Sequence, residues 1–233
     1  MTDPDNENIE VKDQNLLVKR RPPGRKGPKN YSKLRLNVEL FLLNSIHKLL
    51  QIMPIGTSLM LGRATGMIAW AICKRERNIS LVQIRSVLYP EKSTKEINSL
   101  IREVFRHIGQ SVAELIMVKR ILDQNLVSCD SLDVIKKAIS NGKGAIAISG
   151  HVGSIELLAA YYSANGIPLT VVGRHSNYPS VNTFIDRMRN VYGVDTILRS
   201  DAKGARRIAK ALLKGTFVAF LVDQDTALEN TFA

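Results

Sequence analysis

The chain has 233 residues, 45% of them hydrophobic, so it can bury a substantial core and is not a chain that is disordered throughout. Lysine and arginine outnumber aspartate and glutamate by 33 to 21, and the net charge of +12 indicates an anionic partner: phosphate, an acidic membrane, an acidic protein or nucleic acid. The two cysteines, Cys73 and Cys129, lie far apart in sequence, which predicts neither a disulfide framework nor a thiolate metal site.

Residues 1–33 are polar and contain several prolines, so we expect a disordered tail. No acidic residue occurs from Gln14 to Val38, whereas lysine and arginine recur throughout that stretch. Such a run is typical either of a solubilising tail or of a polybasic segment that binds anionic lipid, with roughly 1 kcal/mol from each charge near the surface.

Residues 34–74 are dense in apolar side chains, and we expect a helical, membrane-associated region. Residues 55–73 approach the roughly 20 residues that cross a bilayer. They form a poor spanning segment, because Arg63 is costly in hydrocarbon and the glycines dilute the hydrophobicity. An interfacial or partly inserted hairpin fits better, with its basic flank on the cytoplasmic side. The alternative is a buried helix of a soluble protein, in which Gly62 and Gly66 form a helix-packing contact.

Residues 75–233 are expected to form an α/β domain. Residues 75–119 read as two helices separated by Tyr89-Pro90-Glu91. From Gly142 onward, short apolar runs alternate with helical patterns, and each such helix is followed by a glycine. The runs are residues 145–149, 169–172, 194–198 and 217–222, and the helical patterns are residues 154–165, 181–192 and 202–214. This order predicts a mostly parallel sheet covered by helices, with ligands bound at the carboxyl ends of its strands.

His151 and Glu156 form the candidate catalytic pair. They lie in the string SGHVGSIE, which follows the first expected strand and opens the next helix. Residues at this spacing lie roughly 140° apart on a continuous helix, so the side chains meet only if His151 lies in the loop before the helix. Gly150 and Gly153 allow such a turn. The carboxylate would then hold one ring nitrogen, leaving the other to take a proton from a hydroxyl that attacks an acyl thioester.

A purely structural interpretation of the same string stays open. Gly153 is an acceptable N-cap, and Glu156 would then occupy the third helical position, where an acid stabilises a helix start without any catalytic role. His151 would then simply follow the strand.

The string around His151 is one of a series of short blocks that run from about Leu36 to the C-terminus. They are Arg77-Asn78, Tyr89-Pro90-Glu91, Phe105 with Gly109 and Glu114, Gly142-Lys143-Gly144, SGHVGSIE, Gly166-Ile167-Pro168, Arg174, Asn182, Met188-Arg189, Gly193, Arg199, Leu213 with Gly215, and Asp223-Gln224-Asp225. In this order and at similar spacing, the chain resembles the lipid A biosynthesis lauroyl/myristoyl acyltransferase family. SGHVGSIE is the specific block.

That resemblance implies a glycerol-phosphate-acyltransferase-like α/β domain at the cytoplasmic face of the bacterial inner membrane, with the His-x4-acid pair catalytic. It also implies transfer of a fatty acyl group, from acyl carrier protein or another acyl thioester donor, to a hydroxyl of a glycolipid such as a lipid A precursor. The expected partners are the thioester donor, a phosphorylated glycolipid and the anionic membrane surface. Neither a dinucleotide pattern nor a phosphate loop occurs, so no cofactor is expected.

The candidate substrate-binding residues are Arg174, Asn182, Arg189, Asp223 and Asp225. Arg174 follows the second strand, as an anion contact for a donor or lipid phosphate or as a plain surface arginine. Asp223 and Asp225 end the fourth strand without histidines or further acids nearby, so no metal site is expected.

A basic stripe is expected on the helix over residues 202–214. Its members, at three- and four-residue steps, are Lys203, Arg206, Arg207, Lys210 and Lys214. It is either a solvated helix face or a docking stripe for an acidic carrier protein or a phosphorylated glycolipid.

Two alternatives to an active acyltransferase follow from the sequence. One is a non-enzymatic basic protein that binds membrane or nucleic acid, although the 6% of aromatic residues and the lack of a recognised motif argue against nucleic acid as a partner. The other is an inactive, truncated acyltransferase. The chain ends at Ala233, soon after Asp225, where members of the family continue. We therefore expect the C-terminal part of the family domain to be missing, with apolar sheet surface and an unpaired edge exposed.

Overall fold

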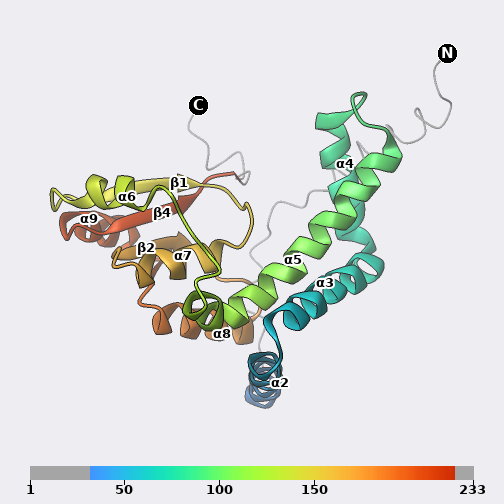
Figure 1. The fold of residues 1–233 in the computed structure, drawn as a ribbon, viewed down its shortest axis with the longest axis horizontal. Helices are drawn as coiled ribbons and strands as arrows, with labels where there is room; N and C mark the ends of the chain where they lie inside the picture. Colours follow the sequence, from blue (N-terminus) through green and yellow to red (C-terminus); the bar gives the residue numbers. More distant parts are fainter. Residues whose placement is uncertain (1–31, 224–233) are drawn as a thin grey trace. The chain divides into compact units, whose positions relative to one another are not determined.

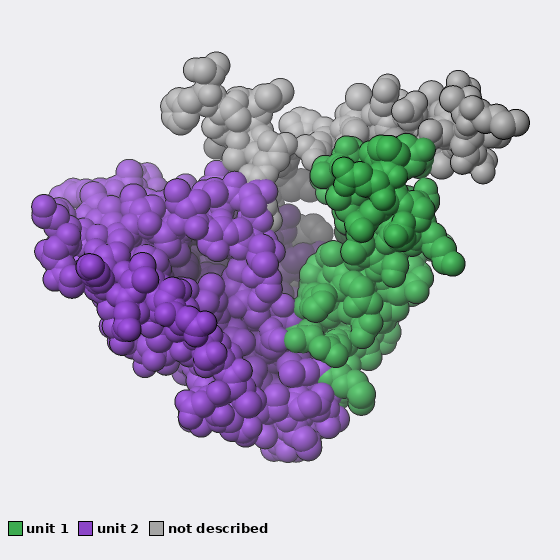
Figure 2. Space-filling model, turned by 45° about the horizontal axis from the view of Figure 1, so that its top comes forward, with its two compact units in different colours: residues 1–27, 60–110, 226–233 green, residues 28–59, 111–225 purple. Residues whose placement is uncertain are grey.

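The structure is a computed structural model that describes residues 32–223, so most of the basic tail, and Asp225, lie outside the described residues. The chain divides into two compact units (Figure 2). Of the described residues, 60–110 belong to unit 1, and 32–59 and 111–223 belong to unit 2.

Unit 1 is helical. It contains most of α3 (Ile55–Ile72), all of α4 (Lys74–Leu88) and the first part of α5 (Thr94–Asp123). The predicted break at Tyr89-Pro90-Glu91 is confirmed, since these residues separate α4 from α5. Ser93 and Glu96 stabilise the start of α5 reciprocally: the Ser93 N–H donates to Glu96 Oε2 at 2.8 Å, and the Glu96 N–H donates to Ser93 Oγ at 3.4 Å.

Glycines let α3 and α5 approach each other backbone to backbone within unit 1. A Cβ added at Gly66 would overlap the carbonyl of Phe105, and one added at Gly109 would overlap the carbonyl of Gly62. Gly62 and Gly66 of α3 therefore lie in a close packing contact with α5. This is the alternative that the sequence left open to a membrane-associated hairpin. No helix within residues 32–223 combines the length and the apolar character that crossing a membrane requires.

Adding a methyl group at this contact should destabilise the fold. We expect Gly66→Ala and Gly109→Ala each to lower the free energy of unfolding by about 1–3 kcal/mol or more. The reason is that the backbone atoms at this contact, unlike side chains, cannot rotate away from the added carbon. Gly56→Ala is the matched control: it lies on α3 with nothing within 4 Å of the added Cβ. The control should be neutral or stabilising by up to about 1 kcal/mol. Thermal unfolding of the three variants checks this, and equal melting temperatures would contradict the close contact.

Unit 2 is an α/β fold, as predicted, with a four-stranded, all-parallel sheet (Figure 1). The strands are β1 (Ala145–Ser149), β2 (Leu169–Gly173), β3 (Asp195–Leu198) and β4 (Phe217–Leu221). Their spatial order is β1-β4-β2-β3, so β4 is paired on both sides and the edges of the sheet are β1 and β3. On β1, Ile146 and Ile148 are 57% and 73% exposed.

Helices cover both faces of the sheet. On one face, Ala159 of α7 (Ile155–Ala164) packs with Leu169 and Val171 of β2 and with Phe217 of the neighbouring β4. On the other, α9 (Gly204–Leu213) contacts β3 and β4 and buries Ile197 and Val218. A helix that the sequence pattern did not predict, α6 (Leu132–Ile139), precedes β1.

A second core of unit 2 forms where α2 (Lys33–Ile52) meets α8 (Pro179–Val191). Its buried members are Leu50, Ile116, Met117, Ile121, Phe184 and Met188. Polar contacts join the same helices: the Ser180 hydroxyl donates to Glu39 Oε2 at 2.6 Å, and Arg187 Nη1 donates to Asn44 Oδ1 at 3.1 Å. Helix α2 is therefore anchored to α8 by both apolar and polar contacts.

Candidate active site

The candidate site lies at the carboxyl ends of β1 and β4, which are neighbours in the sheet. Ser149 is aligned with Leu221, so the residues that follow the two strands, His151 and Asp223, leave the sheet side by side. His151 Nδ1 lies 2.8 Å from Asp223 Oδ1, and the His151 backbone N–H donates to Asp223 Oδ2 at 2.7 Å. The two side chains are 40% and 42% exposed, so the pair is open to solvent and to substrate.

Local backbone geometry permits this contact. A Cβ at Gly150 would lie only 3.2 Å from Asp223 Oδ2, so glycine leaves room for the carboxylate. Gly153 has a φ of +65°, a conformation that other residues rarely adopt, and it turns the chain from the His151 loop into α7. Both glycines of the string therefore act where the turn was expected.

The charge of Asp223 determines which tautomer of the neutral imidazole is present. Hydrogen bonds from the backbone N–H and then the ring of His151 lower the pKa of Asp223 below its ordinary value. Asp223 is therefore ionised at neutral pH, and its contact with His151 is lost only as the pH falls through that lowered pKa. An ionised carboxylate only accepts hydrogen bonds, so the proton of neutral His151 resides on Nδ1, and Nε2 carries the lone pair.

Glu156 lies in the first turn of α7, and its carboxylate contacts Arg189 of α8. Arg189 Nε donates to Glu156 Oε2 at 2.9 Å, Nη2 donates to Oε1, and Nη1 donates to the Thr196 hydroxyl at 3.3 Å. The side chains of Arg189 and Glu156 are 19% and 17% exposed, so this is a largely buried, two-point ion pair. The structure thus brings His151 together with Asp223, and Glu156 together with Arg189.

The capping alternative for Glu156 differs from the structure in its details. The N-cap of α7 is Ser154 and not Gly153, so Glu156 is the second helical residue. The Glu156 carboxylate is engaged by Arg189, not by the helix end. An acid in the first turn still favours the helix dipole, but capping is not its main contact.

The other predicted residues are dispersed around the same edge. Arg174 is exposed after β2. Asn182 accepts from the Ser176 N–H and donates to the Ser176 carbonyl, both at 2.9 Å, so it shapes the loop between β2 and α8. Asp225 lies outside the described residues. The sequence analysis did not identify a second histidine–carboxylate contact, in which His175 Nε2 lies 3.1 Å from Asp186 Oδ2. The only sequence signal for it is that His175 lies in the loop directly before the helix that contains Asp186.

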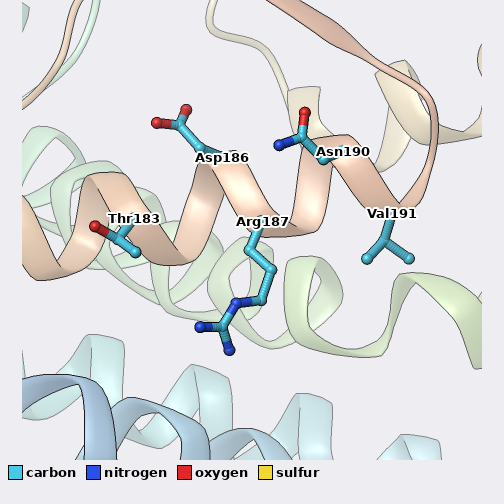
Figure 3. A pocket seen from close by; sticks show the side chains of 5 residues that line it. All are labelled: Thr183, Asp186, Arg187, Asn190 and Val191. Carbon is cyan, nitrogen blue, oxygen red and sulfur yellow. The ribbon is translucent and has the colours of Figure 1, made fainter.

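Besides a cavity of about 450 Å³ beside α9, two cavities lie among the described residues of this unit. One, of about 360 Å³, lies between the sheet and α7; apolar residues of β1, β2 and β4 line it together with Glu156 and Arg189. The other, of about 580 Å³, runs along the outside of α8 and is lined by residues of that helix alone, among them Asp186 and Arg187 (Figure 3). The described residues contain no cluster of three or more histidines, cysteines or carboxylates suited to a metal ion.

Comparison with known proteins identifies the family of the chain. A family model described as bacterial lipid A biosynthesis acyltransferase matches residues 26–233. The chain belongs to this family. No curated protein matches the chain significantly. Membership implies acyltransferase activity in lipid A biosynthesis.

Breaking the Glu156–Arg189 pair should destabilise unit 2. We expect Arg189→Met to lower the free energy of unfolding by about 1–3 kcal/mol, because it leaves a largely buried carboxylate without its ion partner. Arg199→Met, at an exposed position on the same edge, is the control and should change stability by less than about 0.5 kcal/mol. Chemical denaturation measures both. A loss no larger for Arg189→Met than for the control would show that the pair contributes nothing to the fold.

Proposed function

We propose that this acyltransferase moves a fatty acyl group from an acyl thioester, carried by acyl carrier protein, to a hydroxyl of a phosphorylated glycolipid such as a lipid A precursor. The observation that carries the mechanism is the contact between His151 Nδ1 and Asp223 Oδ1 at 2.8 Å. It orients the ring and leaves Nε2 as the basic nitrogen, which is what a general base needs near neutral pH.

In the proposed reaction, Nε2 of His151 takes the proton of the acceptor hydroxyl as its oxygen attacks the thioester carbonyl carbon. The new carbon–oxygen bond forms, the carbon–sulfur bond breaks, and the departing sulfur takes the proton back from the imidazolium. Asp223 stabilises the positive ring between these two transfers. No acyl-enzyme is needed, and neither Ser149 nor Ser154 lies in a nucleophile-elbow sequence.

Glu156 is proposed as a positioning residue. Through Arg189 it ties the first turn of α7 to α8, and α7 begins directly after the loop that carries His151. Arg174, exposed at the carboxyl end of β2, is proposed as a contact for a phosphate of the donor or the glycolipid. Asn182 is proposed to support the loop on which Arg174 lies.

Activity should depend on His151 and Asp223 more than on any other pair. We expect His151→Ala and Asp223→Asn each to lower kcat by about 10²–10⁴-fold, because the first removes the base and the second removes the charge that holds its tautomer. Both side chains are well exposed, so melting temperatures should stay near the parent value. The measurement is transfer of a radiolabelled acyl group to a phosphorylated glycolipid.

Glu156→Gln provides the contrasting case. It should lower both the melting temperature and the rate, since it weakens the anchoring of α7. If Glu156→Gln abolished turnover at an unchanged melting temperature while Asp223→Asn stayed active, Glu156 would be the orienting acid after all.

We further propose that the enzyme acts at the cytoplasmic face of the inner membrane and binds that surface through α2. One face of α2 packs on α8, and the opposite face is exposed and apolar. Its exposed large apolar residues are Leu34, Val38, Phe41, Leu42, Ile46, Leu49 and Ile52. They recur at three- and four-residue steps beside Lys33, Arg35 and Lys48, the pattern of a helix that lies in the membrane interface.

Replacing apolar side chains on this face should weaken membrane binding. We expect Phe41→Gln with Leu49→Gln to lower partitioning onto vesicles of anionic phospholipid at least about tenfold, because two large side chains no longer enter the interface. Val134→Gln with Val191→Gln is the control, since these valines are equally exposed on other helices. Vesicle co-sedimentation measures both. An equal loss in both double variants would mean that α2 has no special role.

A further inference from the structure

Helix α9 presents an exposed basic stripe that no part of the proposed chemistry uses. Arg206, Lys210 and Lys214 follow one another at four-residue steps, and all three are exposed. Leu213, 82% exposed, lies on the same side, since the four residues fall within about 100° of arc on a helix. Helix α9 contains no acidic residue. In the structure the stripe consists of these four residues, whereas the sequence pattern also includes Lys203 and Arg207.

The cations of this helix are of two kinds. Arg207 is engaged within the fold: Nη1 donates to Asp201 Oδ2 at 3.2 Å, and Nη2 donates to the Thr196 carbonyl at 3.1 Å. In contrast, no ion pair among residues 32–223 engages the three cations of the stripe. Their charge is therefore available to a partner.

The position of α9 relates the stripe to the site. The helix begins at Gly204, where an added Cβ would lie 3.5 Å from the Leu198 carbonyl, so its first turn lies at the carboxyl end of β3. His151 leaves the same edge from β1, three strand positions away, about 14 Å at the usual strand spacing. From there the stripe runs about 12 Å along the sheet toward Lys214. A partner on the stripe could thus present a group on a flexible arm to the catalytic edge.

We propose that the stripe is the docking surface for the acidic carrier protein that delivers the acyl thioester, an inference that rests on the proposed function. Cations one helical turn apart are complementary to carboxylates at the same spacing on a partner helix. Leu213 supplies an apolar contact among them, as in a small interface with a polar rim.

Charge and composition favour this partner over the others. A lipid surface takes up many apolar side chains, as on α2, whereas Leu213 is the single exposed large apolar residue of α9. Binding to single-stranded nucleic acid uses aromatic platforms, and α9 contains no aromatic residue.

The test compares a carrier-bound donor with a small one. Arg206→Glu, Lys210→Glu and Lys214→Glu are combined in the full chain, and acyl transfer is measured from acylated acyl carrier protein and from the acyl-N-acetylcysteamine thioester, which lacks the carrier. We expect KM for the carrier donor to rise roughly tenfold or more at an unchanged kcat, with no change for the small thioester. KM for the carrier donor should also rise with salt in the parent protein.

The matched control reverses three exposed lysines elsewhere in unit 2, namely Lys136→Glu, Lys137→Glu and Lys143→Glu. It imposes the same change in net charge and should leave both donors unaffected. A glutamine version of the stripe variant, with a smaller expected rise in KM, serves if the reversed variant does not fold.

The possible failures are distinguishable. If the parent protein transfers from neither donor, the proposed function is wrong. If it transfers from both and the stripe variant keeps its KM for the carrier donor, the docking surface is wrong while the function stands. An equal rise in KM for the stripe and control variants would also refute the docking surface. So would a stripe variant that keeps its KM for the carrier donor but binds anionic vesicles less in a co-sedimentation assay.

Discussion

The parallel pairing of β1 with β4 is the constraint on which the candidate site depends. It aligns Ser149 with Leu221, so that a loop and a strand end from distant parts of the sequence leave the sheet together. The carboxylate of Asp223 then receives both the backbone N–H and the ring of His151. Two contacts to one acid fix the loop as well as the ring, which is how a solvent-exposed histidine keeps one orientation and one tautomer.

Helix α8 connects this site to the helix proposed to bind the membrane. One end of α8 holds Glu39 of α2 through Ser180, and the other end holds Glu156 of α7 through Arg189. Between them, Phe184 packs edge-on against His47, whose pKa is lowered first by burial and then by Arg187. His47 is half-buried, and a neutral ring suits this apolar contact. The proposed interfacial helix and the loop that carries His151 are thus attached to one element, α8.

The sequence predicted the local features of this fold and missed the nonlocal ones. The four strands, the helices between them and the loop position of His151 follow from periodicity and from glycines, which act within a few residues. The strand order does not, because an alternating pattern fits several orders. The pattern therefore places Asp223 correctly at the carboxyl edge of the sheet, as a substrate-binding residue, but it does not predict the contact of Asp223 with His151. The partner of Glu156 was missed for the same reason, since Arg189 reaches it only through the packing of α8.

The physical difference between the two acids explains why the structure supports Asp223 as the partner of the ring. Glu156 is largely buried, and its charge is already compensated at two points by the guanidinium of Arg189. Such a carboxylate offers little further stabilisation to an imidazolium, because the positive guanidinium beside it cancels most of the electrostatic potential of the carboxylate within a few ångströms. Asp223 receives two N–H groups of one residue while its side chain remains 42% exposed, so its negative charge remains available to a ring that gains a proton. A base that must gain and release a proton in each turnover needs an acid of this second kind.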